Sequence, residues 1–159
     1  MDILGSFYAP KDEVEKTLMI VSANAALGWY DALRFGSESG RAEIMNNEKF
    51  FARAFLLSGA TTTGKFKEFM KGHPDLARES VLQGLAFAER ERKNPHYDVR
   101  WPTAYGLERV VCAQGGPCNP PKEMPADLWD KAWEDARRQV TSYYEMDAST
   151  SSSTNDRVR

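Results

Sequence analysis

The chain has 159 residues, of which 42% are hydrophobic and 11% aromatic, so it can bury one hydrophobic core without help from metals or many disulfides. Acidic and basic residues nearly balance, with 23 Asp and Glu against 21 Lys and Arg. Nucleic-acid binders depend on an excess of positive charge to neutralise phosphates, so this balance argues against nucleic acid as a partner.

The longest stretch of low charge is TLMIVSANAALGWY at 17–30. It is shorter than the ~20 apolar residues that a membrane-spanning helix needs. The acidic segment KDEVEK at 11–16 leads into it, whereas a secretory signal begins with positive charge. We therefore expect no membrane insertion, no export signal and a cytoplasmic location.

Hydrophobic side chains recur every three or four residues along most of the chain, which is the spacing of a helix face. A first helix is predicted from Pro10, a favoured first-turn residue, to about Phe35. The sequence GSESG at 36–40 ends this helix. Its apolar face holds Val14, Leu18, Val21, Ala25 and Trp29.

Two further helices are predicted before position 73. One spans about 41–57 and stops before Gly59. The other is short and stops at Gly72. The apolar residues of the first are Ile44, Met45, Phe50, Phe51 and Phe55, and those of the second are Phe66, Phe69 and Met70.

Three more helices are predicted in the second half of the chain. Pro74 opens the fourth, and RERK at 90–93 places positive charge at its C-terminal end, where the helix dipole favours it. The fifth spans 103–112, and the sixth begins at Pro125. The apolar stripe of the fourth is Leu76, Val81, Leu82, Leu85 and Ala88, and that of the sixth is Leu128, Trp129, Ala132, Trp133, Ala136, Val140, Tyr143 and Tyr144.

These elements predict an all-α fold, a single-domain bundle of five or six helices over 1–146. Residues 147–159 are rich in Ser and Thr, and Val158 is their only large hydrophobic residue. Such a segment buries too little apolar surface to order itself, so we expect a disordered C-terminal tail.

Cys112 and Cys118 are the only cysteines. Their C-x5-C spacing is wider than the close cysteine pair of a structural zinc site, and the only histidines, His73 and His96, are far apart in the sequence. We therefore predict no metal site and no cofactor.

A disulfide between Cys112 and Cys118 is the preferred interpretation of this pair. The intervening Gly115, Gly116 and Pro117 allow the tight turn that brings two Cβ atoms to about 4 Å. A disulfide would place the protein in the periplasm or outside the cell, because cytosolic thiols stay reduced. Two buried, inert thiols are the alternative.

The segment HYDVRWP at 96–102 has the composition of a recognition loop. Tyr, Trp and Arg are enriched at the energetic centres of protein interfaces. Flanking prolines reduce the entropy lost when such a loop is held in one conformation. The predicted partner-binding residues are Tyr97, Asp98, Arg100 and Trp101.

The sequence thus predicts a non-catalytic helical module that binds another protein. Among such proteins we favour a bacterial immunity protein or inhibitor that neutralises a toxin or enzyme, since blocking an active site needs shape and a few charges rather than a reactive group. The alternative is a small helical enzyme or ligand-binding protein with a pocket near Arg100, Glu108 and His96.

Overall fold

The computed structural model describes residues 14–45, 63–97, 106–117, 119 and 121–144. The helices are α2 (Val14–Arg34), α4 (Thr63–Gly72), α5 (Pro74–Arg92), α7 (Glu108–Ala113) and α8 (Trp129–Tyr143), and the 3-10 turn η2 (Ala126–Leu128) precedes α8. Residues 38–45 are also helical. The described ranges contain no β-strand, and the all-α helical bundle is confirmed.

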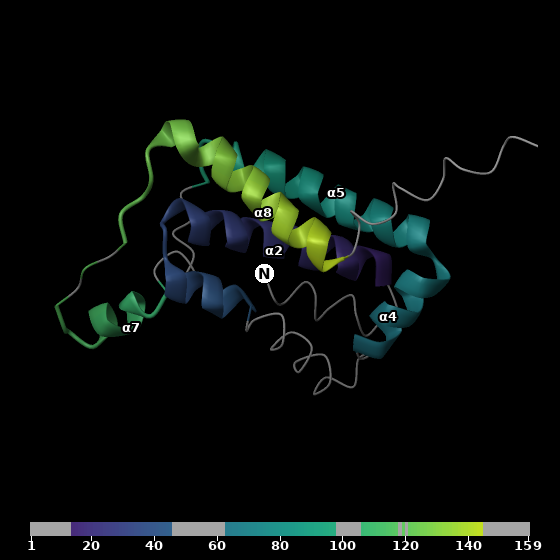
Figure 1. Cartoon of the computed structure of the whole chain (residues 1–159), viewed down its shortest axis with the longest axis horizontal. Helices are drawn as coiled ribbons and strands as arrows, with labels where there is room; N and C mark the ends of the chain where they lie inside the picture. The colour runs from purple at the N-terminus through teal and green to yellow at the C-terminus, as the bar shows by residue number, and fades with distance from the viewer. Residues whose placement is uncertain (1–13, 46–62, 98–105, 118, 120, 145–159) are drawn as a thin grey trace, which may run out of the picture.

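Helix α2 lies at the centre of the bundle, and α5 and α8 both pack against it (Figure 1). Residues 26–32 of α2 are all buried, so this part of the helix is enclosed on every side and not on one apolar face alone. A helix that is apolar around its whole circumference belongs inside a core. The low charge of residues 17–30 is the sequence feature that permits this position.

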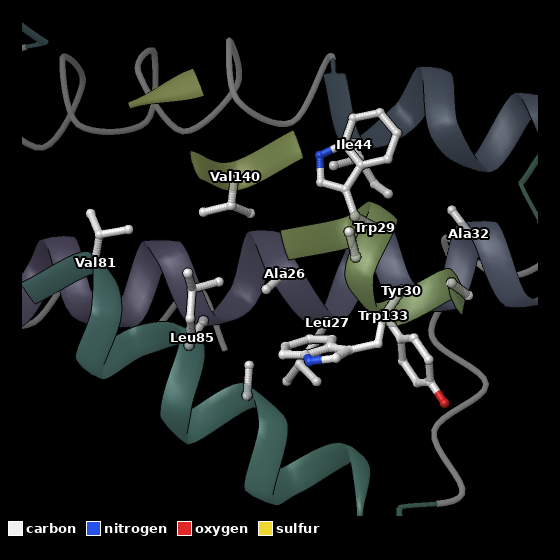
Figure 2. Close-up of a cluster of buried hydrophobic side chains, with 14 of the residues drawn as sticks. Ala26, Leu27, Trp29, Tyr30, Ala32, Ile44, Val81, Leu85, Trp133 and Val140 are labelled. Carbon is white, nitrogen blue, oxygen red and sulfur yellow. The ribbon is translucent and has the colours of Figure 1, made fainter. Parts of the chain in front are cut away.

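The core is built from large side chains on both sides of α2 (Figure 2). Trp133 from α8 lies beside Leu27 and meets the ring of Tyr30 edge to face, with ring centroids 6.1 Å apart and planes at 85°. This arrangement brings the positive ring edge to the negative ring face. Trp29 lies with Ile44 on the opposite side of α2 and so extends the core to the helix at 38–45.

Small side chains allow α2 and α5 to approach closely. A Cβ atom at Gly84 of α5 would overlap the carbonyl oxygen of Met19 and lie 3.0 Å from the Cβ of Ser22. The hydroxyls at this contact remain satisfied because Ser22 Oγ donates to the carbonyl of Leu18 at 2.5 Å, and Ser80 Oγ donates to that of Leu76 at 2.8 Å. The serines can therefore be buried without an unpaired donor.

The break predicted at 36–40 is present and is built by two linked caps. Gly36, at φ +62°, occupies the left-handed position of a Schellman motif, in which Ser37 N donates to the carbonyl of Ala32 and Gly36 N donates to that of Leu33. Ser37 Oγ then accepts from Gly40 N at 3.0 Å, the N-cap bond of the next helix. The second helix therefore begins at 38 and not at 41.

The predicted apolar stripe of α5 is partly wrong. Leu76 and Leu82 are 43% and 44% exposed. The side of α5 that faces the bundle carries smaller residues, because the close approach at Gly84 sets the rotation of the helix. The buried residues of α5 are Ala77, Ser80, Val81, Gly84, Leu85 and Ala88.

The fifth and sixth helices also differ from the predictions, the fifth in where it begins and the sixth in how much of it is buried. The fifth helix was expected over 103–112, whereas α7 begins at Glu108 because Gly106 and Leu107 form a turn. At the two ends of the sixth, Leu128 and Tyr143 are 42% and 58% exposed, so the buried part of α8 is only its middle. The buried residues of α8 are Ala132, Trp133, Ala136 and Val140.

Some predictions fall on residues that the structure does not describe. They include the start of the first helix at 10–13, most of the second helix beyond position 45, the start of the fifth at 103–105, and the tail at 147–159. Among the described helices, none combines the length and the apolar character needed to cross a bilayer.

We expect Gly84→Ala to destabilise the protein by about 1–3 kcal/mol, because the added methyl overlaps the Met19 carbonyl and overpacking costs of this size are typical. In an open helix the same change stabilises, since Ala exceeds Gly in helix propensity by about 1 kcal/mol. Gly72→Ala, where a Cβ meets nothing within 4 Å, is the matched control. Urea unfolding measures the free energy of unfolding of both variants against wild type. A Gly84→Ala variant at least as stable as wild type would contradict the close approach of α2 and α5.

Candidate functional site

Two features of the described structure are candidates for function: the exposed helix α7 and a buried cluster of charges around Arg34. Helix α7 stands apart from the bundle of α2, α5 and α8 (Figure 1). None of its six residues is buried. The Arg34 cluster, in contrast, lies where α2 meets the turn after α5 and the segment before α8.

Helix α7 is held against the start of the helix at 38–45. Gly106, at φ +51°, fits closely there, since a Cβ at this position would overlap Ser39 Oγ. Leu107 N donates to the same hydroxyl at 3.0 Å. Arg109 Nη1 donates to both carboxylate oxygens of Glu43, at 2.5 and 2.6 Å. These polar contacts position α7 while leaving its apolar side chains uncovered.

Three exposed apolar side chains, one just before α7 and two on it, form one surface, which we call the α7 apolar surface. It consists of Leu107, Val110 and Val111, which are 63%, 42% and 38% exposed. Residues three and four positions apart share a helix face, so the three side chains are neighbours. Scattered exposed hydrophobics need no explanation, but a contiguous group is typical of an interaction site.

Of the predicted recognition residues, only Tyr97 lies in the described part of the chain. Asp98, Arg100 and Trp101 are outside it. Tyr97 is half-buried, packs against the core, and donates its hydroxyl to Asp31 Oδ2 at 3.1 Å. Burial and then the neighbouring Asp31 charge raise the pKa of the Tyr97 hydroxyl. Whether this ring also contacts a partner stays a prediction.

The alternative site near Arg100, Glu108 and His96 is described only in part, since Arg100 lies outside the described residues. Glu108 is the half-buried first residue of α7. His96 is exposed in the turn after α5, where its backbone N–H donates to Asn94 Oδ1 at 2.9 Å. The enzyme or ligand-binding alternative therefore stays a prediction.

Arg34 is the centre of the buried charge cluster. Its side chain is 7% exposed, and its guanidinium contacts two carboxylates, with Nη2 at 3.1 Å from Asp31 Oδ1 and Nε at 3.2 Å from Glu123 Oε1. Four aromatic rings surround the same guanidinium, at 5.1–5.9 Å from its Cζ to the ring centroids. These rings belong to Tyr30, Phe35, Tyr97 and Trp129.

The main chain of Arg34 also holds the segment that leads into α8. Met124 N donates to the Arg34 carbonyl at 2.8 Å, which satisfies one of the carbonyls left open at the end of α2. Trp129 Nε1 in turn donates to the Met124 carbonyl at 3.0 Å. Side chain and main chain of one residue thus connect α2 to α8.

A second buried arginine, Arg92, joins the end of α5 to the start of α8. Its side chain is 8% exposed, and it forms ion pairs with Glu89 at 3.3 Å and with Asp130 at 2.9 Å. Its guanidinium also lies 5.0 Å from the centroid of Trp133. A planar guanidinium stacks on aromatic faces at low desolvation cost, which suits arginine to this position.

Asp31 is the most unusual ionisable group of the cluster because its side chain is completely buried. Burial raises its pKa from 3.8 to about 7, against the opposing effects of the Arg34 charge and the Tyr97 hydrogen bond. Since no part of Asp31 is exposed, its contacts are with other groups of the same chain.

The sequence pattern did not predict this cluster. The available signal was the pair Asp31 and Arg34, two charges one turn apart at the end of an otherwise uncharged stretch and flanked by aromatic residues. A charged pair in such a setting indicates burial with satisfied partners. Tyr97 lies 66 positions after Asp31, and Glu123 lies 89 positions after Arg34. Sequence spacing therefore could not identify them as the partners.

The predicted disulfide has one described member. Cys112 is half-buried near the end of α7, and no free cysteine occurs among the described residues. The chain turns back after it, with Gly115 at φ +74° and Gly116 N donating to the Val111 carbonyl at 3.1 Å. Cys118 lies outside the described residues, so its pairing with Cys112 stays a prediction.

In the described ranges no three or more His, Cys, Asp or Glu side chains are grouped so that they could hold a metal ion. Comparison of the chain with protein-family models, with curated proteins and with solved structures found no match. Its candidate function therefore rests on the geometry of its own residues.

We expect Arg34→Met to destabilise the protein by about 3 kcal/mol at pH 8, because it leaves the buried Asp31 carboxylate without its cation. Arg137→Met is the matched control, since it removes an exposed pair with Glu134 at 3.2 Å and such pairs contribute at most about 1 kcal/mol. Guanidinium unfolding measures both; equal losses in the two variants would contradict a central role for Arg34.

We expect the natively purified protein to have an intact mass lower by two hydrogens than the reduced protein and to resist thiol alkylation, because the glycines at 115 and 116 would allow Cys112 and Cys118 to approach to bonding distance. The two masses are compared by mass spectrometry without and with a reductant. Alkylation of both cysteines in the native protein would remove the disulfide and leave the two inert thiols as the correct interpretation.

Proposed function

We propose that this protein is a non-catalytic helical module that binds another protein through the α7 apolar surface and the segment that precedes it. The observation that carries the proposal is the exposure of Leu107, just before α7, and of Val110 and Val111 on it, while polar contacts hold α7 against the helix at 38–45. Burying these side chains against a partner would recover about 25 cal/mol for each Å² of apolar surface removed from water.

The adjoining sequence supports the same surface. The predicted recognition residues Tyr97, Asp98, Arg100 and Trp101 precede α7 by fewer than a dozen positions and have the composition of an interface centre. Aromatic and arginine side chains next to exposed aliphatic ones match the usual make-up of an interface, with apolar contacts at its core and polar groups around them.

Within this class we favour an inhibitor or immunity role, with a toxin or enzyme as the partner. Such a protein works by covering an active site with a rigid surface and complementary charges. The nearly neutral charge of the chain disfavours nucleic acid as the partner. A periplasmic or secreted location is proposed if the disulfide forms, because cytosolic thiols stay reduced, and a cytoplasmic one if both thiols are free.

We expect replacement of Leu107 and Val110 by Ser to reduce partner capture at least tenfold, because truncating two central apolar contacts costs about 1–2 kcal/mol each. The test captures partners from a lysate of the source organism with wild-type and variant protein at low salt and identifies them by mass spectrometry. Affinity of the purified partner is then measured by calorimetry.

The matched control for this experiment is the double replacement of Leu76 and Leu82 by Ser. These leucines are similarly exposed, at 43% and 44%, but lie on α5, remote from α7 in sequence. A partner that binds through the α7 apolar surface is retained by this control variant. A partner lost equally from both variants, or from neither, would falsify the assignment of the interface to α7.

A further inference from the structure

The buried cluster contains one cation that is shared by two carboxylates from different parts of the chain. Arg34 lies 3.1 Å from Asp31, its neighbour on α2, and 3.2 Å from Glu123, in the segment before α8. The two carboxylates differ in environment, since Asp31 is completely buried while the side chain of Glu123 is 38% exposed. When both are ionised, two negative charges compete for one positive charge.

Within the described ranges, the groups that face Asp31 come from three parts of the chain. Arg34 faces it from α2, the Tyr97 hydroxyl from the turn after α5, and the Glu123 carboxylate from the segment before α8. Of these, the Arg34 charge and the Tyr97 hydrogen bond favour the ionised form of Asp31, and the charge of Glu123 disfavours it. The other buried cation, Arg92, is engaged with Glu89 and Asp130.

The hydrogen bonding of Asp31 is incomplete, which leaves room for a proton on this carboxyl. Its Oδ2 accepts from Tyr97 at 3.1 Å. Its Oδ1 accepts no hydrogen bond of suitable geometry from the described residues, although Arg34 Nη2 is close. A fully buried carboxylate with unmet hydrogen-bonding capacity is costly in its ionised form and much less costly when protonated.

We propose that Asp31 is a proton switch for the attachment of the 121–125 segment: when Asp31 is protonated, Arg34 binds Glu123 alone and holds the segment, and when Asp31 is ionised, it competes for Arg34 and loosens that hold. The attachment being switched includes the bonds from Met124 N to the Arg34 carbonyl and from Trp129 Nε1 to the Met124 carbonyl. The switch does not depend on the proposed binding function.

The titration of Asp31 agrees with this geometry, because burial raises its pKa from 3.8 to about 7. Between about pH 4 and pH 7 the folded protein holds a proton that the unfolded chain has released. The contribution of Asp31 to the free energy of unfolding is therefore fully present at the acidic end of this window, falls as the pH rises through it, and levels off above pH 7.

The first experiment follows the Cγ resonance of Asp31 by carbon NMR as the pH is raised, in wild type and in Glu123→Gln. We expect a midpoint near 7 in wild type and a midpoint lower by about half a unit to one unit in the variant, since a competing negative charge has been removed. Asp130→Asn is the matched control, because it removes an exposed carboxylate from the other buried arginine, at 2.9 Å, and leaves the midpoint unchanged.

The second experiment measures the attachment itself by hydrogen exchange of Met124 N–H, corrected for the intrinsic effect of pH on exchange. Ionisation of Asp31 and attachment of the segment are linked equilibria, so each affects the other by the same factor. If Glu123 shifts the Asp31 midpoint by one pH unit, Met124 N–H should be protected from exchange about tenfold less at about pH 8 than at about pH 6 in wild type. Asp31→Asn, which cannot ionise, is expected to hold Met124 N–H equally well at both pH values. Asp130→Asn retains the wild-type dependence.

Three results would overturn the proposal. An Asp31 midpoint below about 5 would mean that Arg34 keeps the carboxylate ionised throughout the neutral range. Equal protection of Met124 N–H at both pH values in wild type would mean that ionisation of Asp31 does not reach the segment. An equal midpoint shift in Asp130→Asn and Glu123→Gln would mean that the effect comes from the total charge and not from competition for Arg34.

Discussion

The burial of Arg34 is the interaction on which the rest of the bundle depends. Removing a guanidinium from water costs several kcal/mol, and the protein offsets this cost with two carboxylates and four aromatic rings gathered from separate parts of the chain. Because the same residue accepts the Met124 hydrogen bond through its carbonyl, the end of α2, the turn after α5 and the start of α8 are fastened at one point. Loss of the Arg34 contacts would therefore weaken all three junctions together.

The central position of α2 follows from where its charges lie. The helix is almost free of charge until Asp31 and Arg34, so its middle can be enclosed by α5 and α8, and its charges are paired with each other at its end. Glycine and serine at the crossing with α5 bring the two backbones close, and the serine hydroxyls bond within their own helices. The bundle thus combines a closely packed crossing with a charged, aromatic end, and the second contains the buried carboxyl of Asp31, whose pKa is raised to about 7.

Helix α7 contrasts with this core. Six residues are too few to form a stable helix in isolation, so α7 depends on its contacts with the helix at 38–45. Those contacts are polar, and they leave Leu107 and its neighbours exposed. A contiguous exposed apolar group adds nothing to stability and is typical of an interaction site. A rigid bundle that carries a small apolar projection is a suitable geometry for recognition, because the entropy of ordering the surface has been met before a partner arrives.

The sequence by itself determined the helical class, the break at 36–40 and the helices α4, α5 and α8, because periodicity and end signals are local properties of the chain. Tertiary structure alone decided the rotation of α5, since backbone contact at Gly84 turned Leu76 and Leu82 outward. It also decided the Arg34 cluster, in which the Tyr97 hydroxyl meets Asp31 and Glu123 reaches Arg34. Such clusters form only when the helices pack. The carboxylates and rings that offset the cost of burying one charge then come from distant parts of the chain, and their spacing in the sequence does not reveal that they will meet.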